Sequence, residues 1–101
     1  MIRVSEKSTL NPTVIAHDAI ASGASATVTI DLAKTYVVSV ARKYQFQTDE
    51  ELDVFKVVKG VVTQILTSPS GSQSCSLSGT TLTITNGASG SYSDYAVVQI
   101  D

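Results

Sequence analysis

The chain has 101 residues, of which 43% are hydrophobic and only 16% are charged. This composition excludes a disordered chain and predicts one folded unit around one hydrophobic core. The net charge is −2 and the basic residues form no run, which argues against a nucleic-acid partner, because such binding needs lysines and arginines that neutralise phosphates.

The polar surface is built from hydroxyl side chains. Fourteen serines and twelve threonines favour the solvent-facing positions of strands and turns. The single cysteine, Cys75, excludes an intrachain disulfide and a cysteine-based zinc site. No apolar run is long enough for a signal peptide or a membrane span, so we expect neither export nor a membrane partner.

The first predicted element is an N-terminal arm or short edge strand over residues 1–12. It ends at Asn11-Pro12, a dipeptide that disfavours helix. The remaining residues, 13–101, are predicted to form a single β-sandwich domain that begins with a strand over 13–20.

Residues 24–32 show the clearest strand pattern in the chain. Hydrophobic side chains occupy alternate positions, and threonine and aspartate stand between them. This period of two predicts a strand with one buried face. A β-branched and aromatic run over 35–44 predicts the strand that follows.

Residues 48–66 fit two structures. Thr48 and Glu51 resemble a helix capping box, and Gly60 suits a helix end, so a short helix over 49–59 is one reading. The β-branched composition and a turn at Lys59-Gly60 favour a hairpin of two strands instead. We favour the hairpin.

Serines occupy every second position from 68 to 78. We interpret this segment as a loop that leads into a strand, with a hydroxyl ladder for assembly or ligand contact as the alternative. A clear strand over 80–85 and a final strand over 92–100 complete the chain. The pattern predicts an all-β fold, an antiparallel sandwich or jelly roll of about eight short strands.

No catalytic site is predicted. The one histidine, His17, adjoins Asp18 in a predicted strand, where neighbouring side chains point to opposite faces and cannot orient one another. A hydrolase in which His17 activates a serine or Cys75 is therefore a weak alternative.

An acidic cluster is the one candidate for a cation. Its carboxylates could offer oxygen ligands to calcium, but the spacing is not that of the twelve-residue EF-hand loop, and a solvated acidic turn or helix start explains the cluster as well. We therefore predict no metal and no cofactor. The cluster consists of Asp49, Glu50, Glu51 and Asp53.

A carbohydrate-binding module is the second functional reading. Sugar sites combine exposed aromatic faces with hydrogen-bonding side chains, and such residues border the loop before the last strand. The candidate glycan contacts are Tyr92, Tyr95, Asn86 and Asp94.

The segments VVTQILTSPSG and SCSLSGTTLTITNGASGSYSDYAVVQID resemble β-sandwich modules of tailed-phage virion proteins, such as tail fibres, baseplate attachments and head decorations. The resemblance implies a non-enzymatic structural protein of the virion, made in the host cytoplasm. It also implies a module that oligomerises, often as a trimer, or attaches to other virion proteins. The pattern carries no site residues that could be transferred.

We expect self-assembly through uncovered strand edges, because the chain has few of the charges that protect sheet edges from pairing. The arm and the last strand are the segments nominated for this contact. The candidate assembly residues are Ile2, Val4, Tyr95, Val97 and Ile100.

Overall fold

The computed structural model describes residues 12–43 and 51–101, which form eight β-strands and no helix. All pairs of neighbouring strands are antiparallel. The all-β prediction is therefore confirmed. The strands are β1 (Thr13–Ile20), β2 (Ser25–Thr29), β3 (Thr35–Lys43), β4 (Glu51–Val58), β5 (Val61–Leu66), β6 (Gln73–Ser78), β7 (Thr81–Asn86) and β8 (Tyr92–Gln99).

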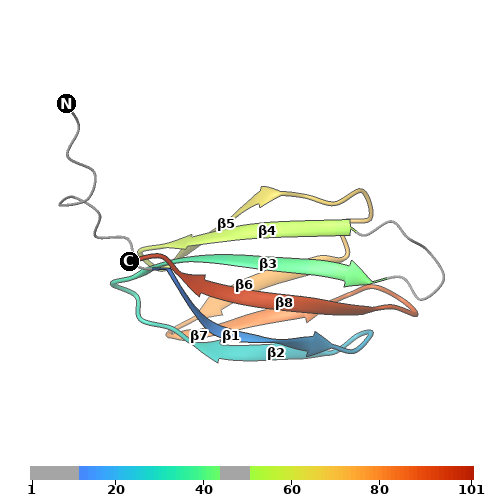
Figure 1. Cartoon of the computed structure of the whole chain (residues 1–101), viewed down its shortest axis with the longest axis horizontal. Helices are drawn as coiled ribbons and strands as arrows, with labels where there is room; N and C mark the ends of the chain where they lie inside the picture. Colours follow the sequence, from blue (N-terminus) through green and yellow to red (C-terminus); the bar gives the residue numbers. More distant parts are fainter. Residues whose placement is uncertain (1–11, 44–50) are drawn as a thin grey trace.

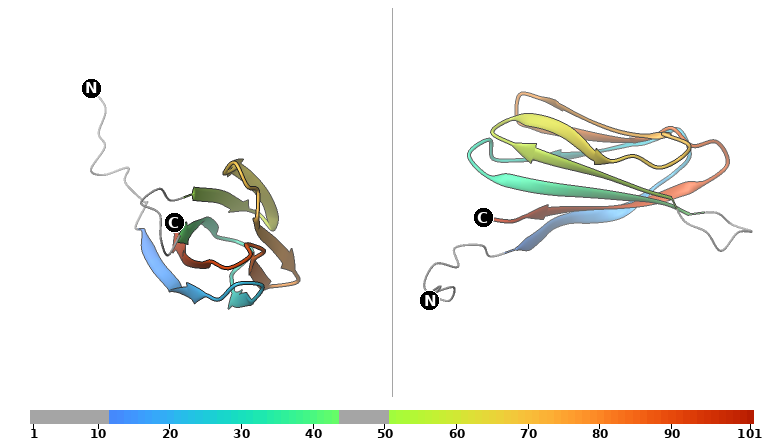
Figure 2. Two further views of the ribbon diagram at one scale, coloured as in Figure 1. Left: turned by 90° about the vertical axis from the view of Figure 1, so that its right-hand side faces the viewer. Right: turned by 90° about the horizontal axis from the view of Figure 1, so that it is seen from above.

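The strands form two sheets that pack face to face as a sandwich (Figures 1 and 2). The larger sheet has the order β1-β8-β3-β4-β5, and the smaller has the order β2-β7-β6. The chain passes from one sheet to the other after β1, β2, β5 and β7. These crossings close both layers around one core.

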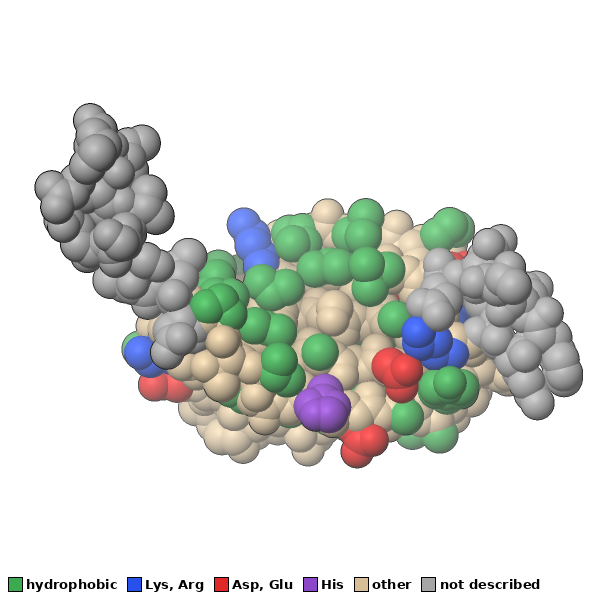
Figure 3. All heavy atoms as spheres, in the orientation of Figure 1, with side chains coloured by type: hydrophobic (Ala, Val, Ile, Leu, Met, Phe, Trp, Pro, Cys, Tyr) green, Lys and Arg blue, Asp and Glu red, His purple; other side chains and the backbone are tan. Residues whose placement is uncertain are grey.

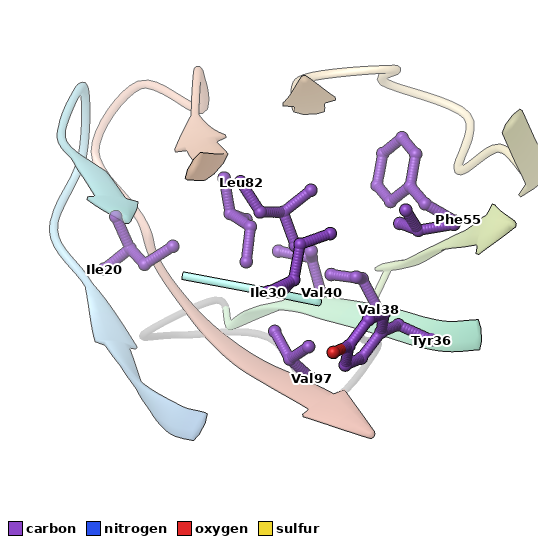
Figure 4. Close-up of a cluster of buried hydrophobic side chains, with 10 residues drawn as sticks. Ile20, Ile30, Tyr36, Val38, Val40, Phe55, Leu82 and Val97 are labelled. Atoms are coloured by element: carbon purple, nitrogen blue, oxygen red, sulfur yellow. The ribbon is translucent and has the colours of Figure 1, made fainter. Parts of the chain in front are cut away.

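The core lies between the sheets and follows the alternation of the strands (Figure 4). Tyr36, Val38 and Val40 on β3 point inward and are almost fully buried. Leu82 and Ile84 on β7 meet them from the smaller sheet, with no exposed surface. The hydroxyl of Tyr36 accepts a hydrogen bond from the amide of Asp31 at 2.9 Å, so this buried phenol is satisfied.

The region 48–66 contains the hairpin, and the helix reading is wrong within the described residues. Val58 pairs with Val61 across a two-residue turn. Lys59 and Gly60 both have positive φ, 49° and 77°, which is the backbone of a type I′ turn. This turn matches the twist of the flanking strands, and the β-branched residues around it pair as β4 and β5.

The last strand is not an edge. β8 lies between β1 and β3 and is hydrogen-bonded on both sides, so the expected contact through an uncovered edge of this strand is wrong. The true edges of the larger sheet are β1 and β5. The pairing of each edge strand is broken by a bulge. One lies between Val14 and Ala16 on β1, and the other lies on β5 opposite Val54 and Phe55 of β4. Bulges of this kind oppose pairing with another chain.

A buried amide closes one end of the sandwich. The side chain of Asn86, with no exposed surface, donates to the carbonyls of Ile20 at 3.0 Å and Ser91 at 2.9 Å. Its Oδ1 accepts from the amide of Ala88 at 3.0 Å and from Gln73 Nε2 at 2.9 Å. All four hydrogen bonds of the side chain are therefore made, and they join both sheets.

The segments around Asn86 approach closely. A Cβ added at Gly87 would lie 2.5 Å from the carbonyl oxygen of Ser72, to which the Gly87 amide donates at 2.8 Å. Glycine is required here because no larger residue fits this contact. Gln73 extends the network, since its Oε1 accepts from the buried Ser93 hydroxyl on β8 at 3.0 Å.

We predict that Asn86→Ala destabilises the fold by about 3 kcal/mol or more, because it leaves buried donors and acceptors without partners. The nearly isosteric Asn86→Asp should lose a similar amount, because a carboxylate oxygen would face the carbonyls of Ile20 and Ser91. Urea unfolding followed by circular dichroism measures both.

The control is Thr83→Ala, which lies between the inward residues Leu82 and Ile84 of β7 but points to the outer side of the sheet, with an expected cost below about 1 kcal/mol. Equal losses for Asn86→Ala and Thr83→Ala would contradict the role of the amide network.

Candidate functional site: the outer faces of the two sheets

The outer side of the smaller sheet is a regular grid of hydroxyls, which we call the hydroxyl face. In register across β2, β7 and β6, three rows each place a hydroxyl on every strand. The residues of the hydroxyl face are Ser25, Thr85 and Ser74, then Thr27, Thr83 and Ser76, then Thr29, Thr81 and Ser78. None of the nine is charged, so water contacts this face through neutral hydroxyls.

The loop that leads into a strand, our interpretation of 68–78, is present, because β6 begins at Gln73. The alternative of a hydroxyl ladder holds only in part. Ser74, Ser76 and Ser78 belong to the grid on β6, whereas Ser68 is buried elsewhere. The Ser25 and Thr85 hydroxyls lie 2.7 Å apart and hydrogen-bond to one another. Since partners within the sheet satisfy some of the hydroxyls, we assign the hydroxyl face to solvation.

The outer side of the larger sheet is different and is called the apolar face. Strand register places mostly hydrophobic side chains on it, and Figure 3 shows these side chains gathered on that side of the molecule. Val61 is 61% exposed, Val14 55% and Leu66 48%. Its hydrophobic residues are Val14 and Ala19 on β1, Tyr92, Ala96 and Val98 on β8, Val37 and Ala41 on β3, Leu52, Val54 and Val58 on β4, and Val61 and Leu66 on β5.

The predicted glycan residues do not form one site. Asn86 is fully buried in the network described above, so its assignment as a glycan contact is corrected. Tyr95 is half-buried and packs against the core, whereas Tyr92 is exposed on the apolar face beside Asp94. The two tyrosines are three residues apart in one strand and so lie on opposite sides of the sheet.

The predicted assembly residues are also divided. Val97 has no exposed surface and belongs to the core, so its assignment as a contact residue is corrected. Ile100 is half-buried, and its amide continues the β8–β3 pairing by donating to Thr35, which places it at the end of the apolar face. Ile2 and Val4 lie outside the described residues.

The residues of the hydrolase reading stand apart. His17 is exposed on the outer side of the larger sheet, opposite Ala96 of β8. Cys75 is on β6 of the smaller sheet and packs toward the core. Burial removes solvent from the thiol and raises the pKa of Cys75 to about 11, which disfavours the nucleophilic thiolate.

An open hollow of about 500 Å³ adjoins His17 at the β1–β8 side of the larger sheet. The other side chains that line it are Asp18, Ala19, Asp94 and Tyr95. Asp18 accepts a hydrogen bond from the adjacent amide of Ala19 at 2.8 Å. These five lining residues include no serine, threonine or cysteine, so the hollow holds no histidine-activated nucleophile.

Two members of the predicted acidic cluster lie on β4 and have partners. Glu51 forms an ion pair with Arg42 at 3.7 Å. Asp53 is fully buried, and its carboxylate accepts hydrogen bonds from Ser68 and from Gln64. Asp49 and Glu50 lie outside the described residues. Over residues 12–43 and 51–101, no three histidine, cysteine, aspartate or glutamate side chains converge as a metal site requires.

Comparison with known protein families, curated proteins and solved structures found no match to this chain. The part of the chain that the structure describes contains no helix long and apolar enough to cross a membrane.

Sequence reasoning missed the apolar face as a unit. Once strand boundaries are known, alternation alone assigns Val37, Val54 and Val98 to the outer side. Their position side by side, however, follows from the pairing of distant strands.

We predict that Cys75 in the folded chain reacts with a thiol reagent at pH 8 at least about 100-fold more slowly than in urea, since the pKa rises from 9.0 to about 11 on folding. Labelling with an aromatic disulfide measures both rates. Because the folded pKa is the higher one, the stability that the neutral thiol contributes is present below pH 9.0 and is lost as the pH rises toward about 11. Native labelling at the unfolded rate would show that the thiol is not protected.

Proposed function

We propose that this chain is a non-enzymatic structural protein of a tailed-phage virion, a fibre, tail or capsid-decoration component that acts by self-assembly or by attachment to other virion proteins. The resemblance of its hydroxyl-rich strands and glycine-asparagine turns to such modules supports the assignment. Its location is the virion.

The observation that carries the proposal is the apolar face. Monomeric soluble proteins rarely expose contiguous hydrophobic patches of more than a few hundred Å². Here hydrophobic residues on all five strands of one sheet face outward. A surface of this kind suits a subunit that is covered in an assembly.

No specific observation favours the two alternatives. For a carbohydrate-binding site, Asn86 is buried in the interior, and Tyr92 and Tyr95 lie on opposite sides of a sheet. The hydrolase reading has His17 and Cys75 on different sheets.

We predict that the chain is present in many copies in phage particles released by the host that encodes it. Particles purified on a caesium chloride gradient and analysed by quantitative mass spectrometry test this directly. An abundant cytosolic host enzyme serves as the control for contamination. Presence in the cell lysate together with absence from the purified particles would refute the virion assignment.

A further inference from the structure

We propose that the apolar face is a two-fold interface that binds the apolar face of a second copy of this chain. The inference deepens the self-assembly part of the proposed function and rests on it. It names the surface, the partner and the symmetry of the contact.

The two outer faces of one molecule give the first argument. The hydroxyl face shows how this sequence covers a sheet that contacts water, with a serine or threonine at each of nine positions. The larger sheet departs from that pattern with valine, leucine and alanine at most of its outward positions. The outward residues of β3, β4 and β8 that differ are Thr35, Ser39, Lys43, Lys56, Tyr92 and Asp94. The same chain therefore treats the two faces differently, and the larger sheet is suited to burial.

The size of the face is the second argument. Five strands about 4.8 Å apart, with about seven residues of about 3.4 Å each, cover roughly 600 Å². Two such faces together bury about 1,200 Å², the lower limit of the range for specific and stable protein interfaces. The face is therefore large enough for a dimer, and sheets stack readily at about 10 Å separation.

Charge complementarity identifies the partner as a second copy. Ser39 is at the centre of the apolar face, on the middle strand. Lys56 on β4 pairs with Val37, two residues before Ser39. Asp94 on β8, on the other side of β3, pairs with Ala41, two residues after Ser39. The two opposite charges are thus placed symmetrically about Ser39.

This placement defines the two-fold axis. An axis parallel to the two sheets, passing over Ser39 at right angles to the line from Lys56 to Asp94, brings each Lys56 opposite the partner's Asp94. The strands of the two copies then cross steeply, as in the orthogonal class of sheet packing. Neither Lys56 nor Asp94 forms an ion pair with another described residue of its own chain.

The geometry favours two copies over three. A two-fold contact uses the same patch on both subunits, whereas a three-fold contact joins two different patches. Lys56 and Asp94 lie symmetrically about the centre of the face, so the face is self-complementary at these positions, whereas the third outward charge, Lys43, lies at the end of β3. Bulges on β1 and β5 also oppose growth of the larger sheet through its edges.

The test is sedimentation equilibrium of the full chain and five variants over a concentration series. The wild type is expected to dimerise with a dissociation constant on the order of micromolar. Ser39→Arg places two cations at the axis and should weaken the dimer by about 100-fold or more. The matched control is Thr83→Arg at the centre of the hydroxyl face, which should leave dimerisation unchanged.

A charge exchange tests the arrangement. Lys56→Glu and Asp94→Lys should each weaken the dimer about 10-fold, because each creates two like-charge pairs, and the double variant should recover most of the affinity. Because the side chains of Lys56 and Asp94 are both exposed, these variants should keep the fold, and circular dichroism of each variant checks this.

Three results would overturn the inference: a wild-type chain that stays monomeric at millimolar concentration, a trimer, or a dimer broken by Thr83→Arg and not by Ser39→Arg. A double variant no tighter than the single ones would overturn the two-fold arrangement. A monomer that is still found in purified particles removes the dimer and leaves the virion role intact. A dimer that is absent from purified particles supports the two-fold interface and refutes the virion role.

Discussion

The fold depends on one side-chain amide at the end of β7. Asn86 joins the end of β1, the loop before β8 and Gln73 of β6, and its own backbone amide and carbonyl bond the turn that leads into β2. The two sheets therefore meet at this end through hydrogen bonds, while hydrophobic side chains fill the space between them farther along. Because a buried amide without partners costs more than a lost contact, the four hydrogen bonds of this side chain stabilise the observed arrangement of these segments.

That constraint positions the outer faces. The end of β1 is held to Asn86, and β1 in turn pairs with β8 along its length. With β8 enclosed between β1 and β3, five strands form one wide sheet whose outer side is not covered by any described residue. The smaller sheet, with β7 at its centre, presents only hydroxyls on its outer side. One amide network thus supports both a solvated face and an apolar one.

Local signals in the sequence predicted the strands well. The alternation over 24–32 and 80–85 became β2 and β7, and the β-branched run with Lys59-Gly60 became a hairpin, since a type I′ turn is a local property. The same alternation also places Asn86 on the inner side after Leu82 and Ile84, yet Asn86 was assigned as a glycan contact, which requires an exposed side chain. The four hydrogen-bond partners of the Asn86 side chain come from segments distant in the sequence as well as near it, so local patterns do not predict them.

The assembly residues were harder to predict, because they depend on pairing between distant segments. Val97 was expected at an edge, but β1 arrives from the other end of the chain to cover β8. The apolar face arises from the same long-range pairing, which no local pattern encodes.

The central claim is that the two outer faces have different roles. The most direct measurement is a dilution series of amide NMR spectra of the wild-type chain. We expect concentration-dependent shifts for amides of β3 and the flanking strands around Ser39, and constant positions for amides of β7 around Thr83. Shifts centred on β7, or none over the whole series, would contradict the central claim.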